Sequence, residues 1–126
     1  MNVFLVDDSP IIRERLKRML AIMEQVKLIG EAGAVPEAID AILDQKPDLV
    51  LLDSPSSNGI GLAMLQRIKS AHPAPAVMIM TDEPHPLYRL KCLEAGADFF
   101  FDKSSEFEQL VAALEQLIQR ASDDGV

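Results

Sequence analysis

Five side chains with reactive groups stand at or just beyond the ends of apolar runs in this sequence. They are Asp7, Asp8, Asp53, Thr81 and Lys103. Asp53 is the clearest case, because it ends the aliphatic run of residues 49–52 abruptly. A carboxylate at the mouth of a buried strand is costly unless a partner pairs with it or coordinates it. The pattern therefore predicts a site built around Asp53.

The chemistry of such a set is phosphoryl transfer to a carboxylate. Three carboxylates in one pocket repel each other, each pair by about 1 kcal/mol at about 4 Å in water and more at a partly screened site. A hard cation such as Mg²⁺ removes that repulsion and keeps open positions for phosphate oxygens. Asp53 is the predicted nucleophile, since carboxylates form acyl phosphates. Lys103 supplies a positive charge and Thr81 a hydroxyl donor for the phosphoryl oxygens.

The elements that must position these groups alternate along the chain. Strand-like apolar runs cover residues 3–6, 26–32, 49–52, 77–80 and 97–101, and helical patterns follow each of them. This alternation predicts an α/β fold with a parallel sheet between two layers of helices. The reactive strand ends converge only if the first, third, fourth and fifth strands are neighbours. This favours the order 2-1-3-4-5, so we expect the flavodoxin-like, doubly wound (βα)5 three-layer sandwich.

Local signals place several helix ends. Ser9 and Pro10 suit the cap and first turn of the first helix, which runs to about residue 24. Gly96 is a plausible left-handed terminator for the fourth helix, which runs through Leu87, Leu90 and Leu93. Ser105 with Glu108 forms a capping-box pattern for a last helix, which we expect to end near residue 120.

Length and charge narrow the function classes. We expect one domain over residues 1–120 of the 126, followed by a short flexible tail over 121–126. The net charge of −8 argues against direct nucleic-acid binding. There is one cysteine, and neither a signal peptide nor a run long enough to span a membrane is recognisable. We therefore expect a cytoplasmic protein with no membrane attachment.

These residues resemble those of a known family. Over about residues 3 to 120 the chain resembles a response-regulator receiver domain of two-component signalling, whose five signature positions match Asp7, Asp8, Asp53, Thr81 and Lys103. The resemblance implies that a histidine kinase or a histidine phosphotransfer protein phosphorylates Asp53. It also implies Mg²⁺ bound by Asp8, Asp53 and the backbone carbonyl of Pro55, with Asp7 acting through water.

The resemblance further implies a switch and an output surface. Thr81 would move toward the phosphoryl group, and Phe100, three residues before the lysine, would change rotamer with it. Downstream proteins would bind the surface of the fourth helix, fifth strand and fifth helix. Such a domain is a signalling phosphoacceptor, and it is no enzyme beyond its own phosphorylation and dephosphorylation. No output segment follows Arg120, so we expect the stand-alone type.

One surface is a candidate for partner docking. The first helix carries four basic residues beside an otherwise acidic site, a stripe that an acidic or phosphorylated partner could recognise. The four are Arg13, Arg15, Lys17 and Arg18.

Several positions depart from the family pattern and keep other readings open. They are Ser54, Ser57, Asp82 and Ser104, the last standing where a proline with a cis peptide bond is common. One alternative is a scaffold that binds partners independently of phosphorylation. Another is a phosphohydrolase with an aspartyl-phosphate intermediate, but Pro55 stands where such enzymes carry their general acid. A flavin site is disfavoured because residues 7–10 read Asp-Asp-Ser-Pro instead of a phosphate-binding loop.

Overall fold

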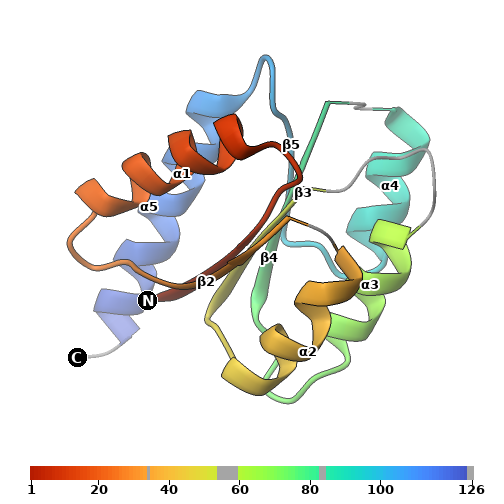
Figure 1. Cartoon of the computed structure of the whole chain (residues 1–126), viewed down its shortest axis with the longest axis horizontal. Helices are drawn as coiled ribbons and strands as arrows, with labels where there is room; N and C mark the ends of the chain where they lie inside the picture. The colour runs from red at the N-terminus through yellow and green to blue at the C-terminus, as the bar shows by residue number, and fades with distance from the viewer. Residues whose placement is uncertain (34, 54–59, 83–84, 125–126) are drawn as a thin grey trace.

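Five parallel strands form a single sheet in the order β2-β1-β3-β4-β5, as the sequence predicted. The computed structural model describes residues 1–33, 35–53, 60–82 and 85–124 (Figure 1). The strands are β1 (Asn2–Val6), β2 (Lys27–Ala32), β3 (Leu49–Asp53), β4 (Ala76–Thr81) and β5 (Phe99–Asp102). The helices are α1 (Pro10–Ile22), α2 (Val35–Gln45), α3 (Ile60–Lys69), α4 (Pro86–Glu94) and α5 (Phe107–Asp124).

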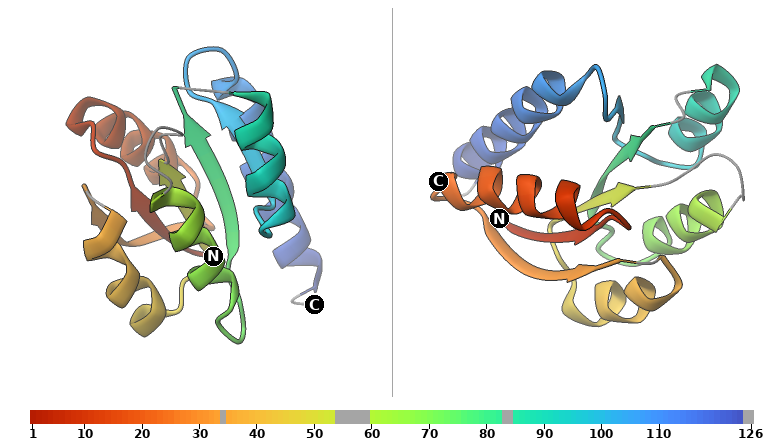
Figure 2. Two further views of the ribbon diagram at one scale, coloured as in Figure 1. Left: turned by 90° about the vertical axis from the view of Figure 1, so that its right-hand side faces the viewer. Right: turned by 45° about the horizontal axis from the view of Figure 1, so that its top comes forward.

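Helices cover both faces of the sheet, which gives the three expected layers. One core joins α1 and α5 to one face, through side chains such as Leu16, Leu20 and Leu114. The other core joins α2, α3 and α4 to the opposite face. In Figure 1 and in the right view of Figure 2 these three helices lie across the sheet from α1 and α5. Strand β3 lies between the two cores and all five of its residues are buried. The aliphatic run before Asp53 is therefore the centre of the molecule, and its carboxyl end is the centre of one sheet edge.

Two predicted helix signals are confirmed. The Ser9 hydroxyl caps α1 by accepting a hydrogen bond from the Ile12 backbone N–H, at 3.3 Å. Gly96 follows the end of α4 with a φ of +109°, a conformation that L side chains rarely adopt.

The last helix differs from its prediction at both ends. Instead of a Ser105–Glu108 capping box, the helix begins at Phe107 and the Glu106 carboxylate accepts a hydrogen bond from the Asp102 N–H, at 3.1 Å. The helix also continues to Asp124, beyond the end near residue 120 that the sequence predicted. The physical reason is that the sequence contains no proline or glycine between Phe107 and Gly125, and Ala121 has a high helix propensity.

Helix α4 turns a different face inward than its leucines suggest. Tyr88 and Cys92 are its buried residues, and they form one narrow stripe because they are four residues apart. Leu87, Leu90 and Leu93 are 53%, 52% and 40% exposed. A single stripe suffices because α4 covers only the edge of the sheet, next to β5. This helix therefore presents a row of leucines to solvent.

Across the described parts of the chain, we find no helix with both the length and the apolar character needed to cross a membrane.

Candidate functional site

The register of the strands brings the predicted reactive residues to one place. Val6 pairs with Leu52, Asp53 with Met80, and Thr81 with Asp102. Extending each pairing by one residue sets Asp7 beside Asp53 and Lys103 just beyond Thr81. The carboxyl ends of four neighbouring strands thus meet at the edge where open α/β sheets bind their ligands.

Lys103 is the link between two of these strand ends. Its Nζ lies 2.9 Å from Asp7 Oδ2 and 2.9 Å from Asp53 Oδ1. The three side chains are 7%, 0% and 10% exposed respectively, so the pairs are screened little by solvent. The Lys103 backbone N–H donates to the Thr81 carbonyl at 2.9 Å, which anchors the lysine to β4. Both ion pairs are thus supported by this one backbone hydrogen bond to β4.

The three carboxylates together fit a divalent cation. Oxygens of Asp7, Asp8 and Asp53 lie within 4.8 Å of one another, and all are hard ligands of the kind that Mg²⁺ prefers. Asp7 Oδ1 is occupied, since it accepts the Ser9 N–H at 2.8 Å. Asp7 Oδ2 is fully buried and lies near Lys103, but no directed hydrogen bond reaches it. A buried carboxylate oxygen with that remaining capacity, next to the exposed Asp8, is what a cation site requires.

Burial and crowding also perturb the two central titrating groups. Burial raises the pKa of Asp53 from its ordinary 3.8 to about 6, opposed by Lys103 and assisted by Asp7 and Asp8. Burial lowers the pKa of Lys103, but its close ion pairs with Asp53 and Asp7 outweigh this effect and the pKa is raised overall. The site is therefore over-supplied with negative charge, and its one ammonium group stays protonated.

The remaining predicted residues occupy different surroundings. Thr81 is fully buried at the end of β4, adjacent to the strand that carries Asp53. Phe100 points to the opposite side of β5 from Phe99 and Phe101, into the core beneath α4. It is 3% exposed and packs edge-on against Tyr88, with ring centroids 5.9 Å apart. Pro55 lies outside the described residues.

The loop that carries Lys103 contains interactions that the sequence analysis missed. The Asp102 carboxylate accepts hydrogen bonds from Ser104 and Ser105. The Lys103–Ser104 peptide bond is trans, because His72–Pro73 is the one cis bond among the described residues. An aspartate followed within three residues by serines is a recognised turn pattern and was visible in the sequence.

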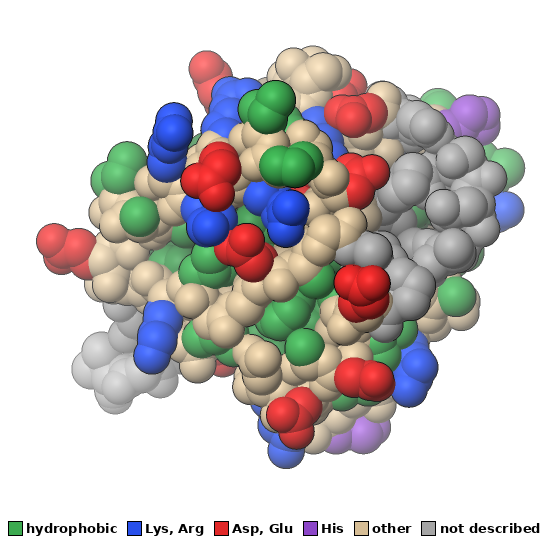
Figure 3. Space-filling view, in the orientation of Figure 1, with side chains coloured by type: hydrophobic (Ala, Val, Ile, Leu, Met, Phe, Trp, Pro, Cys, Tyr) green, Lys and Arg blue, Asp and Glu red, His purple; other side chains and the backbone are tan. Residues whose placement is uncertain are grey.

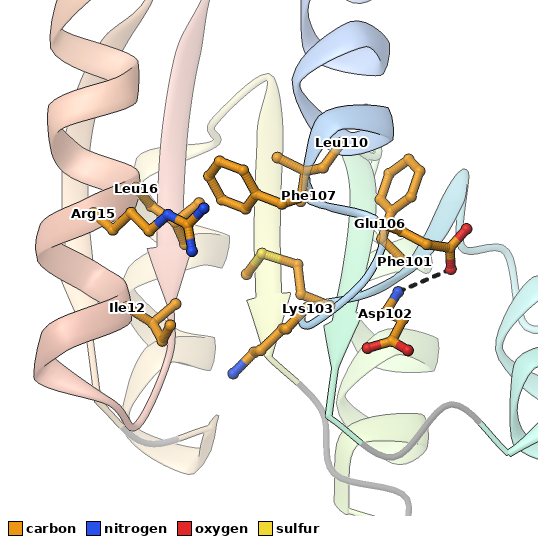
Figure 4. Close-up of a pocket in the computed structure, with 10 residues that line it drawn as sticks. Ile12, Arg15, Leu16, Phe101, Asp102, Lys103, Glu106, Phe107 and Leu110 are labelled. Atoms are coloured by element: carbon orange, nitrogen blue, oxygen red, sulfur yellow. Dashed lines mark hydrogen bonds between the residues drawn. The ribbon is translucent and has the colours of Figure 1, made fainter.

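A small cavity lies between α1 and α5 behind Lys103. It measures about 20 Å³, room for a single water molecule, and its lining includes Leu16, Met80 and the stem of Lys103 (Figure 4). Arg15 and Phe107 also line this cavity. The Arg15 guanidinium lies 4.0 Å from the centroid of the Phe107 ring. This cation–π contact ties α1 to the first residue of α5.

The basic stripe of α1 is less uniform than the sequence suggested. Lys17 pairs with Glu14 at 3.3 Å and Glu31 at 3.0 Å, and Arg13 lies 3.8 Å from Glu31. Acidic and basic side chains are accordingly mixed over this face in Figure 3. Arg15 and Arg18 are exposed, with Ile11 and Ile22 each 81% exposed at the two ends of the helix. The outward face of α1 is therefore a mixed apolar and basic surface.

Known proteins with similar sequences are response regulators. The chain is 34% identical over 121 residues to protein-glutamate methylesterase/protein-glutamine glutaminase 1 of Carboxydothermus hydrogenoformans, covering 95% of this chain and 36% of that protein. It is 32% identical to sensory transduction protein LytT of Enterococcus faecalis, covering 98% and 49%. The chain thus spans between about a third and a half of the length of these curated relatives.

Solved structures agree with the fold and the family. The receiver domain of the putative response regulator NarL from Mycobacterium tuberculosis superposes with a TM-score of 0.81 at 26% identity, covering 94% of this chain and 95% of that one. The response regulator domain of Thermotoga maritima CheB gives 0.78 at 27% identity, covering 98% and 96%. The family model of the response regulator receiver domain matches residues 3–115. The chain therefore belongs to the response regulator receiver domain family, the signalling domains of two-component systems.

Proposed function

We propose that this receiver domain accepts a phosphoryl group on Asp53 from the phosphohistidine of a histidine kinase or a histidine phosphotransfer protein. The observation that carries the proposal is the position of the Asp53 carboxylate. It ends the central strand, is nearly buried, and lies 2.9 Å from an ammonium group and beside two further carboxylates. Packing of the fold does not require this arrangement, and its excess negative charge is unfavourable without a cation.

Asp8, Asp53 and the backbone carbonyl of Pro55 would hold Mg²⁺ directly, and Asp7 would act through a water molecule. The bound cation would supply positive charge that offsets both the crowded carboxylates and the incoming phosphoryl oxygens. The chain's own contribution is to hold the three carboxylates within reach of one another. Asp7 is fixed for this role by its hydrogen bond from the Ser9 N–H at 2.8 Å.

In the transfer step an oxygen of Asp53 attacks phosphorus. A P–O bond forms as the P–N bond of the phosphohistidine breaks, and the imidazole nitrogen retains the electron pair of that bond. Lys103 lies within reach of the developing charge, since its Nζ already contacts Asp53. Its ammonium group then exchanges a carboxylate contact for a phosphoryl oxygen, and the Thr81 hydroxyl donates to another. In this proposal the chain catalyses only its own phosphorylation and dephosphorylation.

We also propose that the protein works in the cytoplasm, together with its kinase.

We propose that phosphorylation changes the conformation of β5 and α4. Movement of Thr81 toward the phosphoryl group would free space near Phe100, which packs against Tyr88 and lies 5.7 Å below the Arg89 guanidinium. A shift of these α4 residues would change the exposed surface of that helix. The leucines of α4 supply apolar area there for a downstream protein on the α4-β5-α5 surface.

The phosphoryl donor is proposed to dock on α1. The exposed Ile11 and Ile22 offer apolar contact, and Arg15 and Arg18 between them offer positive charge. The helix begins next to Asp8, so a donor seated on it would lie close to the carboxylates.

The test is chemical phosphorylation of the purified chain. Incubation with phosphoramidate and Mg²⁺ should add one phosphoryl group, seen by intact-protein mass spectrometry, to the wild type and not to Asp53→Asn. Asp40→Asn is the matched control, since Asp40 is an exposed carboxylate on α2. Equal labelling of wild type and Asp53→Asn would refute the assignment. Partner binding unchanged by phosphorylation would favour a constitutive scaffold instead.

A further inference from the structure

The loop that presents Lys103 is closed upon the side chain of Asp102. Asp102 Oδ1 accepts hydrogen bonds from the Ser104 N–H at 2.9 Å and from the Ser104 hydroxyl at 2.7 Å. Its Oδ2 accepts the Ser105 hydroxyl at 2.9 Å. Three hydrogen bonds on one carboxylate, all from the two residues after the lysine, form a tight turn around the Lys103 position.

The backbone of the same loop is held from its other side. The Asp102 N–H donates to Glu106 Oε1 at 3.1 Å, and the Glu106 N–H donates back to the Asp102 carbonyl at 2.9 Å. Lys103 donates its own N–H to the Thr81 carbonyl. The polypeptide on either side of Lys103 is therefore fixed by hydrogen bonds from Asp102, Glu106 and β4.

Such fixation matters because lysine is a long side chain. Its ammonium group must reach both Asp7 and Asp53 at 2.9 Å, yet its stem has four rotatable bonds. A trans Lys103–Ser104 bond, with no proline ring beside it, leaves the loop dihedrals to be set by hydrogen bonds. The Asp102 carboxylate supplies more of them than any other side chain that the structure describes in the loop.

Asp102 is placed to act on the loop and not on the reacting atoms. In Figure 4 its carboxylate and the Lys103 ammonium point to different sides of the chain. Its hydrogen bonds from Ser104, by side chain and backbone, and from Ser105 lower the pKa of Asp102, so the carboxylate is ionised and the turn intact near neutral pH.

We propose that Asp102 is a positioning residue for phosphoryl transfer, because its carboxylate holds the 102–106 loop in the form that delivers the Lys103 ammonium group to Asp53. This inference rests on the proposed function and adds a residue to it. Removing the carboxylate should leave Lys103 present but poorly placed. A misplacement of about 1 Å can cost about a hundredfold in rate, so even a small relaxation of the turn should be measurable.

The experiment compares three variants of the full chain with the wild type. Asp102→Ala removes both carboxylate acceptors and should slow phosphorylation by phosphoramidate about tenfold or more. Asp102→Asn keeps Oδ1 as the acceptor for Ser104 and turns an amide N–H toward the Ser105 hydroxyl, so it should restore most of the rate. The double variant Ser104→Ala/Ser105→Ala keeps the Asp102 charge but loses both hydroxyl bonds, and should fall between them.

A second readout separates positioning from general damage. The Mg²⁺ dissociation constant, measured by titration calorimetry, should be unchanged or lower in Asp102→Ala. The reason is that Asp7, Asp8 and Asp53 are untouched while the ammonium group that competes for two of them is held less firmly. A variant that is merely misfolded would bind Mg²⁺ more weakly.

Three outcomes would overturn the inference. They are a wild-type rate in Asp102→Ala, an Asp102→Asn rate as low as that of alanine, or Mg²⁺ affinity that falls in step with the rate. Each differs from failure of the proposed function, in which the wild type itself takes up no phosphoryl group and this inference falls with it.

Discussion

A lysine–aspartate pair lies at the amino ends of the strands and another at their carboxyl ends, and the two pairs are built differently. At the ends where β4 and β5 begin, Lys69 Nζ lies 3.0 Å from Asp98 Oδ2 and 2.8 Å from the Pro75 carbonyl. Asp98 Oδ2 also accepts the Val77 N–H at 2.8 Å. One positive charge meets one negative charge, and both side chains are tied to backbone.

At the opposite end one ammonium group faces three carboxylates. Lys103 contacts Asp7 and Asp53, while Asp8 lies alongside and Asp7 Oδ2 has hydrogen-bonding capacity to spare. The Lys69–Asp98 pair serves the fold, because its charge and hydrogen bonds are balanced. The Lys103 site has three carboxylates and one ammonium group, an excess of negative charge that the proposed Mg²⁺ would offset. An excess of buried negative charge is thus the physical feature that marks the Lys103 end as the candidate functional site and distinguishes it from the Lys69–Asp98 pair.

The largest expected effect comes from removing each lysine in turn. Lys103→Met should lower the rate of phosphorylation by phosphoramidate about a hundredfold or more, since a preorganised positive charge is lost from the transition state. Lys69→Met is the matched control and should phosphorylate at the wild-type rate. Equal loss in both variants would erase the distinction between the two pairs.

Mg²⁺ should stabilise only the unbalanced end. At a concentration about 100 times its dissociation constant, a cation bound to the folded state alone adds about 2.7 kcal/mol to the free energy of unfolding, or about 10 °C in Tm. Asp8→Ala should lose most of this shift, whereas Asp98→Ala should keep it. Scanning calorimetry with and without Mg²⁺ decides the matter, and a full shift in Asp8→Ala would move the cation site elsewhere.

The pH dependence of the free energy of unfolding should also reflect the excess negative charge at the Lys103 end. The folded protein holds the Asp53 proton more tightly than the unfolded chain does, since the pKa rises from 3.8 to about 6. Without divalent cations, this contribution to stability is full below about pH 4 and is lost as the pH rises through about 6. The free energy of unfolding should therefore fall across that window by an amount on the order of 3 kcal/mol.

Urea unfolding at a series of pH values tests this window. Asp53→Asn should remove the fall and be more stable than the wild type above pH 6, because it also relieves repulsion with Asp7 and Asp8. A wild-type profile in that variant would place the perturbed carboxyl elsewhere.

The smallest effect belongs to the balanced pair. Lys69→Met should lower the free energy of unfolding by about 0.5–1 kcal/mol, since the pair is partly exposed and Asp98 keeps its hydrogen bond from Val77. Urea unfolding measures this, and the Mg²⁺ shift should be unchanged. A loss several times larger would mean that the pair fixes the start of β4 and β5 more strongly than its exposure suggests.

Much of the fold and the position of the candidate site followed from local sequence. Apolar runs that stop at polar residues predicted the strands, and a parallel sheet carries all such ends to one edge. The strand order was predicted correctly too, because Asp7, Asp53, Thr81 and Lys103 can meet only if their four strands are neighbours, which favours the observed order. The roles of Ser9 and Gly96 could be predicted because a helix cap and a left-handed glycine depend on a few adjacent residues.

Two sequence predictions, the capping box and the basic stripe, were inaccurate because the residues involved have several possible interaction partners. Ser105 and Glu108 matched a capping box, but the Asp102 carboxylate took the Ser105 hydroxyl and Glu106 took the Asp102 N–H. The four basic residues of α1 read as one stripe, yet Glu31 of β2 pairs with Arg13 and Lys17. Sequence spacing alone does not rank such competing partners, because their distances depend on how the strand and helix are packed.

The sequence by itself determined the kinds of groups at the site and the edge of the sheet at which they meet. Side-chain chemistry and strand periodicity are local properties, so one chain suffices to read them. Only the tertiary structure decided which carboxylates share Lys103, which Asp7 oxygen keeps spare capacity, and that Asp102 closes the loop. Those facts depend on distances of a few ångströms between segments far apart in the chain, which packing of the whole molecule sets.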